Sequence, residues 1–92
     1  MSDSYKHLKA FKEGIQRARL IRQDLRKTLT EYRPEKVRGL NNAYISTIKE
    51  VIKQGNLFLD KTDNFELGLK VAITMENYQA FLSTLPNADE TK

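Results

Sequence analysis

One stretch of the chain decides the fold: residues 5–33 read YKHLKAFKEGIQRARLIRQDLRKTLTEYR. Apolar side chains recur in it at alternating steps of three and four residues, with one interruption where Arg22 takes the expected apolar position. This spacing is typical of a helix with a heptad-like apolar seam, and it predicts one long helix over about residues 4–33. We expect the seam to be a helix interface, and its members are Leu8, Phe11, Ile15, Ala18, Leu25, Leu29 and Tyr32.

A basic flank runs beside the seam at intervals of seven residues. Its members are Lys12, Arg19, Arg26 and Arg33. Seven residues are nearly two helical turns, so these four side chains project from one side of the helix. An alternative interpretation is that they lie along the edge of the seam and pair with acids of the same chain or a partner. With neighbouring basic residues they form the candidate surface for a polyanion or an acidic partner: Lys12, Arg19, Arg26, Lys27, Arg33, Lys36 and Arg38.

Gly14 is the one internal weakness of this helix. Glycine inside a helix costs about 1 kcal/mol relative to alanine, so Gly14 marks a kink, a break or the close approach of another helix. A continuous helix of about 28 residues is roughly 42 Å long. A compact chain of this size has a radius of gyration of about 12 Å, so such a helix would extend beyond it. We therefore expect the helix either to fold back at Gly14 or to find a partner for its exposed length.

A second helix is predicted over about residues 37–54 from apolar residues at helical spacing. Its start has two alternatives. Pro34 has the fixed φ that suits a first helical position, or Asn41 is the N-cap of a later start that Gly39 favours. Its end is expected at Gly55 and Asn56, because both residue types readily adopt the left-handed conformation that terminates helices.

A third helix is predicted over about residues 63–85, where Asp63 and Glu66 resemble a capping box and Pro86 follows the end. The same region also alternates between apolar and polar residues, so the alternative is an α+β fold with a strand hairpin at residues 57–75. Residues 86–92 are expected to be a flexible polar tail. The predicted fold is therefore all-α: residues 1–85 form one domain, either a three-helix bundle or a helical hairpin with a third helix.

Composition limits the function classes. The chain has 92 residues and no cysteine, which excludes disulfide frameworks and thiolate zinc sites. Residues 1–38 hold eleven Lys and Arg and five Asp and Glu, a net charge of +6, whereas residues 39–92 hold five and seven, a net charge of −2. Such asymmetry points to nucleic acid, an anionic membrane or an acidic partner surface. No secretion signal or membrane span is recognisable, so we expect a cytoplasmic protein.

The sequence gives no indication of catalysis. His7 is the only histidine, and nothing links it to a nucleophile, so we interpret it as an ordinary helix-surface residue. Asp60, Thr62 and Asn64 have the oxygen spacing that opens an EF-hand loop, but Phe65 and Val71 occupy the positions of its glycine and bidentate glutamate. We therefore predict a protein that is not an enzyme and has no metal site, cofactor or small-molecule substrate.

Three functional hypotheses remain, and all rest on the first helix. The first is a small regulatory or adaptor protein that binds a partner protein, as a homo-oligomer with the long helix in the interface. The alternative is a module that binds DNA or RNA through the basic flank, with Tyr32 and Tyr44 as stacking groups. Binding of the same helix to an anionic membrane surface ranks third.

Overall fold

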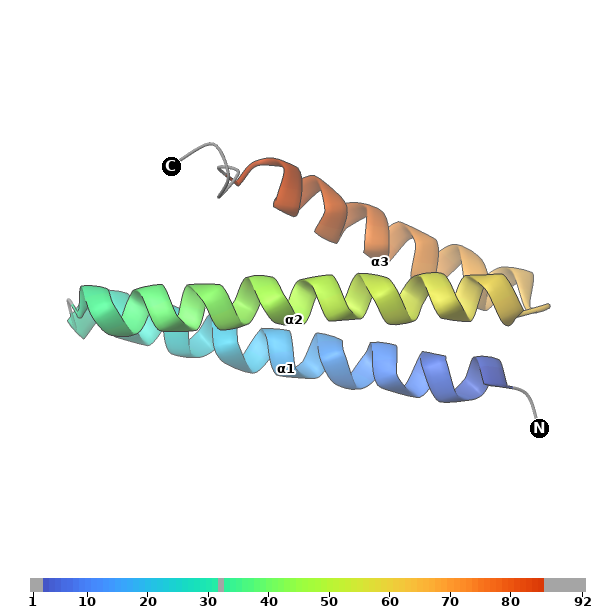
Figure 1. The fold of residues 1–92 in the computed structure, drawn as a ribbon, viewed down its shortest axis with the longest axis horizontal. Helices are drawn as coiled ribbons and strands as arrows, with labels where there is room; N and C mark the ends of the chain where they lie inside the picture. Colours follow the sequence, from blue (N-terminus) through green and yellow to red (C-terminus); the bar gives the residue numbers. More distant parts are fainter. Residues whose placement is uncertain (1–2, 32, 86–92) are drawn as a thin grey trace.

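In the computed structural model, which describes residues 3–31 and 33–85, the chain forms three helices, and these residues contain no strand. Helix α1 (Asp3–Glu31) and helix α2 (Pro34–Lys61) form a long antiparallel hairpin, and helix α3 (Phe65–Ser83) folds back along α2 (Figure 1). This confirms the predicted all-α arrangement with a long first helix. The alternative of a strand hairpin at residues 57–75 is wrong. The predicted tail at 86–92 and Tyr32 lie outside the described residues.

The molecule is elongated, with dimensions of 47 × 28 × 17 Å and a radius of gyration of 15.1 Å. This radius of gyration exceeds the roughly 12 Å of a compact chain of this size, and α1 does not fold back at Gly14. The reason is that α2, with 28 residues, is almost as long as α1, with 29, and packs along it. The length of α1 is thus covered within the chain and does not by itself require a second chain.

The core lies where all three helices overlap, because the apolar steps of three and four residues turn one face of each helix inward. Fully burying one large apolar side chain stabilises a fold by about 1.5–3 kcal/mol. The largest fully buried side chains, Ile48, Val51 and Phe58, all belong to α2, the central helix. The other buried apolar side chains come from both neighbours: Leu8, Phe11, Ala18, Val71 and Met75.

The predicted seam of α1 therefore divides into two parts. Leu8, Phe11 and Ala18 are buried, and Ile15 packs against the core, so this part of the seam is used within the chain. Towards the end of α1, Leu25 is half-buried and Leu29 is 59% exposed. Only this second part is accessible to another molecule.

Of the alternatives for Gly14, the structure shows the close approach of another helix, and the same physical reason explains why Gly55 does not end α2. Helix α1 runs through Gly14, which is buried against Val51. The predicted end of the second helix at Gly55 is wrong, because α2 continues to Lys61. A Cβ on Gly55 would lie 2.9 Å from Met75 Cγ and 3.0 Å from Phe11 Cε1. Both glycines thus permit neighbouring helices to approach closely, and neither ends a helix.

The helix starts also differ in detail from the prediction. Helix α2 begins at Pro34, so the Asn41 alternative is wrong. The capping box at Asp63 is wrong as well, because Asn64 is the N-cap of α3: its side-chain Oδ1 accepts a hydrogen bond from the Leu67 N–H at 3.0 Å. The Asn64 N–H donates to Thr62 Oγ1 at 3.1 Å, which shapes the short turn between α2 and α3.

Candidate functional site

Helix α3 is shorter than the hairpin it covers. Its 19 residues are about 28 Å long, against about 43 Å for α1. Near its end, the Phe81 ring meets the Tyr44 ring edge to face, with the centroids 5.4 Å apart and the planes at 78°. Beyond this contact the hairpin continues towards the α1–α2 turn without α3 (Figure 1). Among the described residues, Leu29, near this end of α1, is accordingly 59% exposed.

A hollow of about 440 Å³ lies where the end of α3 meets the hairpin, and all three helices contribute to it. We call it the Arg22 groove. Four side chains on its walls, Leu25, Tyr44, Tyr78 and Phe81, are half-buried. Its lining residues are Arg22, Leu25, Arg26, Leu29, Asn41, Tyr44, Asn77, Tyr78 and Phe81.

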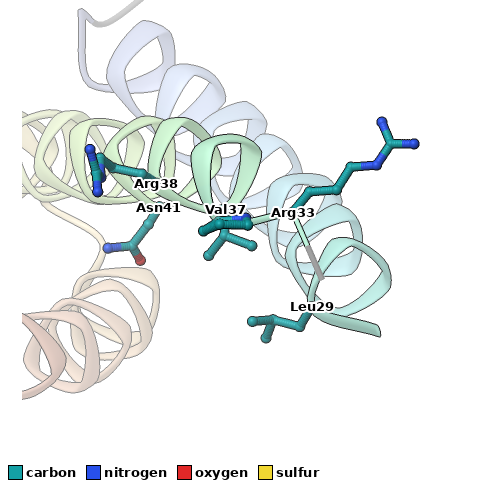
Figure 2. A pocket seen from close by; sticks show the side chains of 6 residues that line it. Leu29, Arg33, Val37, Arg38 and Asn41 are labelled. Atoms are coloured by element: carbon teal, nitrogen blue, oxygen red, sulfur yellow. The ribbon is translucent and has the colours of Figure 1, made fainter. Parts of the chain in front are cut away.

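A second hollow, of about 400 Å³, lies at the α1–α2 turn, and we call it the turn pocket. Leu29 and Asn41 line both hollows, so the two form one continuous surface along the hairpin. Figure 2 shows that the Arg33 side chain points away from Leu29 and Asn41, at the outer edge of the pocket. The residues that line the turn pocket are Leu29, Arg33, Pro34, Val37, Arg38 and Asn41.

Three arginines, Arg19, Arg22 and Arg26, form a cluster beside the groove, where they line a small hollow of about 180 Å³ together with Gln23. All three are exposed. Their side chains make no hydrogen bond or ion pair with any residue in 3–31 or 33–85. Among the described residues, no Asp or Glu lines this hollow, the groove or the turn pocket. The surface is therefore apolar with a positive edge that no acidic residue in 3–31 or 33–85 pairs with, and such an edge attracts acidic groups.

The environment of Tyr78 shows how these arginines act on the groove. Burial raises the pKa of the Tyr78 phenol above its ordinary value of 10.0, because the phenolate loses solvation, and the charge of the Tyr44 phenolate raises it further. The positive charges of Arg19 and Arg22 act in the opposite direction and lower this pKa. The arginine cluster thus favours negative charge at the groove wall.

The structure separates the basic residues that the sequence grouped together. Arg19 and Arg26 are in the arginine cluster, and Arg33 and Arg38 line the turn pocket. The predicted basic flank is interrupted before its last member, because α1 ends at Glu31 and Arg33 is the N-cap residue of α2. Lys12, Lys27 and Lys36 are exposed and line none of the three hollows.

Sequence reasoning missed the side of the groove that α3 supplies and gave Arg22 no site of its own. Arg22 takes an apolar position in the seam, and this place in the seam puts it in the groove lining. Asn77, Tyr78 and Phe81 come from α3, and no local pattern relates them to α1. Tyr44 was expected near the basic region, and the structure places it in the groove wall.

His7 has a structural partner. Its Nδ1 lies 2.9 Å from Gln54 Oε1, and Gln54 Nε2 donates to Glu50 Oε2 at 2.8 Å, so these side chains connect α1 to α2. This polar connection accounts for a half-buried histidine that the sequence suggested was on the surface. Among the described residues, no group of three or more His, Cys, Asp or Glu lies where it could hold a metal ion.

The chain matches no protein-family model, and no curated protein and no solved structure shows significant similarity to it. Within the part of the chain that the structure describes, no helix is both long and apolar enough to cross a membrane.

Proposed function

We propose that this chain is a non-enzymatic regulatory or adaptor protein that binds a partner protein through the Arg22 groove and the turn pocket. One observation carries the proposal: a continuous apolar surface lies where α3 leaves the hairpin uncovered, and the arginines at its edge make no ion pair with the part of the chain that the structure describes. Apolar patches with polar rims are typical of interaction sites. Tyrosine and arginine, both present here, are the residue types that often dominate binding energy.

The side chains that line the Arg22 groove and the turn pocket indicate what kind of partner would bind there. Leu25, Leu29 and Val37 offer an aliphatic floor that accepts apolar side chains. Arg22 and Arg26 stand at its edge, and a guanidinium group can bind a carboxylate through two parallel hydrogen bonds. A partner segment with apolar residues on one side and Asp or Glu at its margin is the best match.

Site-specific photo-crosslinking in source cells tests this proposal. A photoreactive amino acid at Asn41, which lines both hollows, should capture a discrete protein that the same probe at Lys53 does not capture. Lys53 is an exposed α2 residue that lines neither hollow, which makes it a matched control. Arg22→Glu with Arg26→Glu should reduce the capture at Asn41. Equal capture at both positions, or none at Asn41, would contradict the proposal.

A second candidate is nucleic-acid binding through the arginine cluster. It is favoured by the three exposed arginines around one hollow and by Tyr78 beside them. The affinity for mixed DNA and RNA should then fall steeply with salt, and Arg19→Gln with Arg26→Gln should reduce both the affinity and the slope of its salt dependence. A salt-independent affinity would argue against this candidate.

A further inference from the structure

We propose that two copies of this chain associate through the outward face of α3, with the two α3 helices antiparallel about a two-fold axis near Leu69. This surface is separate from the Arg22 groove, so the inference goes beyond the proposed function. It relocates the self-association that the sequence suggested for α1 to a face that is accessible.

The outward face of α3 carries an apolar stripe. Phe65, Leu69 and Ile73 are 81%, 50% and 54% exposed, and their spacing of four residues places them along one side of the helix. The opposite side of α3 is also apolar and packs into the core through Val71 and Met75. A helix that is apolar on both sides is typical of a position between two packed layers. Within residues 3–31 and 33–85, α3 packs against one such layer, the α1–α2 hairpin.

A hollow of about 390 Å³ borders the stripe between α3 and the end of α2. Phe65 and Leu69 form one edge of it, and Gly68, which is buried beside Leu59, and the small residue Ala72 also line it. A two-fold axis near Leu69 brings the second copy's Ile73 within about 2 Å of the level of Phe65 along the helix axis. An apolar side chain of the second copy can therefore fill this hollow.

Charge complementarity identifies a second copy as the occupant. Glu66 and Lys70 each follow a stripe residue by one position, so both lie on the same flank of the stripe. In an antiparallel pair related by a two-fold axis, each flank faces its own counterpart. With the axis at the level midway between Gly68 and Leu69, the second copy's Lys70 lies within about 2 Å, along the helix axis, of the level of Glu66, whereas the two copies of Lys70 are about 4.5 Å apart in level. Each dimer thus forms two opposite-charge contacts by symmetry.

The two side chains that would form these opposite-charge contacts are both accessible. Glu66 and Lys70 are exposed, and neither makes a side-chain hydrogen bond or ion pair with another described residue. A parallel arrangement would place this flank against the opposite one, which carries Gly68 and Ala72 and no charge at the same level. Glu76 marks the far end of the apolar stripe, which keeps the contact centred on Leu69.

Sedimentation equilibrium of the full chain over a range of concentrations tests the association. One helix face is small beside the roughly 800 Å² per partner of a standard interface, so we expect a reversible dimer with a micromolar dissociation constant. Leu69→Asp should abolish the dimer, whereas Leu20→Asp, at an α1 leucine that is 52% exposed, should leave it intact. A wild-type chain that stays monomeric to millimolar concentration would overturn the proposal.

Charge reversal tests the antiparallel arrangement. Lys70→Glu or Glu66→Lys alone should raise the dissociation constant roughly tenfold at low salt, because each replaces two attractive contacts with two repulsive ones. An equimolar mixture of the two variants should form a heterodimer, and the double reversal Glu66→Lys with Lys70→Glu should dimerise like the wild type. Lys49→Glu, at an exposed α2 lysine, is the control for net charge.

If both single reversals dimerise like the wild type, the antiparallel α3 contact is wrong. The same holds if the mixture of the two variants stays monomeric. Leu69→Asp should not change photo-crosslinking at Asn41, and Arg22→Glu with Arg26→Glu should not change the dimer. Failure of the α3 contact and failure of the proposed partner-binding groove can therefore be told apart.

Discussion

Gly14 of α1 lies against Val51 of α2 so closely that a Cβ atom placed on Gly14 would be 2.5 Å from Val51 Cγ2. Val51 is completely buried, so its methyl group has no free space to move into. The contact explains why a long helix keeps a glycine in its interior at a cost of about 1 kcal/mol relative to alanine.

Gly14→Ala should therefore destabilise the fold. Overpacking in a core typically costs about 1–3 kcal/mol, which exceeds the gain in helix propensity, and we expect a lower melting temperature by circular dichroism. Gly39→Ala is the control, because a Cβ at Gly39, also inside a helix, meets nothing within 4 Å. It should stabilise the protein by about 0.5–1 kcal/mol. Equal effects of the two substitutions would show that the Val51 contact is unimportant.

A double-mutant cycle should locate the cost of Gly14→Ala at Val51. Val51→Ala alone removes buried methyl groups and should cost roughly 1–3 kcal/mol. In the Val51→Ala background, however, Gly14→Ala should be neutral or stabilising, because Cγ2 is no longer present. Denaturant unfolding would measure the four free energies, and additive values would exclude the proposed contact.

Asn64→Ala should cost about 1 kcal/mol, since the hydrogen bond from the Leu67 N–H to Asn64 Oδ1 caps α3. Asn64→Asp should retain most of the stability, because aspartate is an equally good N-cap. Asn42→Ala, at an exposed site in the middle of α2, should change the unfolding free energy by less than about 0.5 kcal/mol. A loss at Asn42 as large as that at Asn64 would argue against capping as the cause.

Tyr78 should titrate above the ordinary tyrosine pKa of 10.0. Subtracting the phenolate absorbance of Tyr78→Phe from that of the wild type isolates this titration. Arg22→Gln should raise the pKa of Tyr78 further, because the Arg22 charge lowers it, and Tyr44→Phe should lower it. A shift in the opposite sense in either variant would mean that the groove has a different arrangement.

The same raised pKa predicts how stability changes at high pH. The folded state holds the phenol proton more tightly than the unfolded state, so its contribution is present in full below pH 10.0 and is lost as the pH rises through the folded pKa. The wild type should therefore lose more unfolding free energy in this range than Tyr78→Phe. Parallel pH profiles of the two proteins would contradict this expectation.

Much of the fold could be predicted from the local pattern of apolar, polar and helix-capping residues. The seam steps from Leu8 to Ala18 predicted a long first helix, and the first part of its seam is buried as an amphipathic helix requires. The third helix begins within two residues of its expected start and ends within two of its expected end. The reason is that the residues that cap or terminate a helix lie within one turn of its ends. The accessible arginines were also predictable, since charged side chains rarely become buried.

What the sequence determined by itself is therefore the number of helices, their apolar faces and the basic character of the first half. Only the tertiary structure decided the roles of Gly14 and Gly55, the extension of α2 to Lys61, and the meeting of Arg22 with Tyr78 and Phe81. The physical reason is that periodicity and capping depend on neighbours along the chain. The space beside a glycine, or beyond the end of a short helix, depends on residues that are distant in sequence.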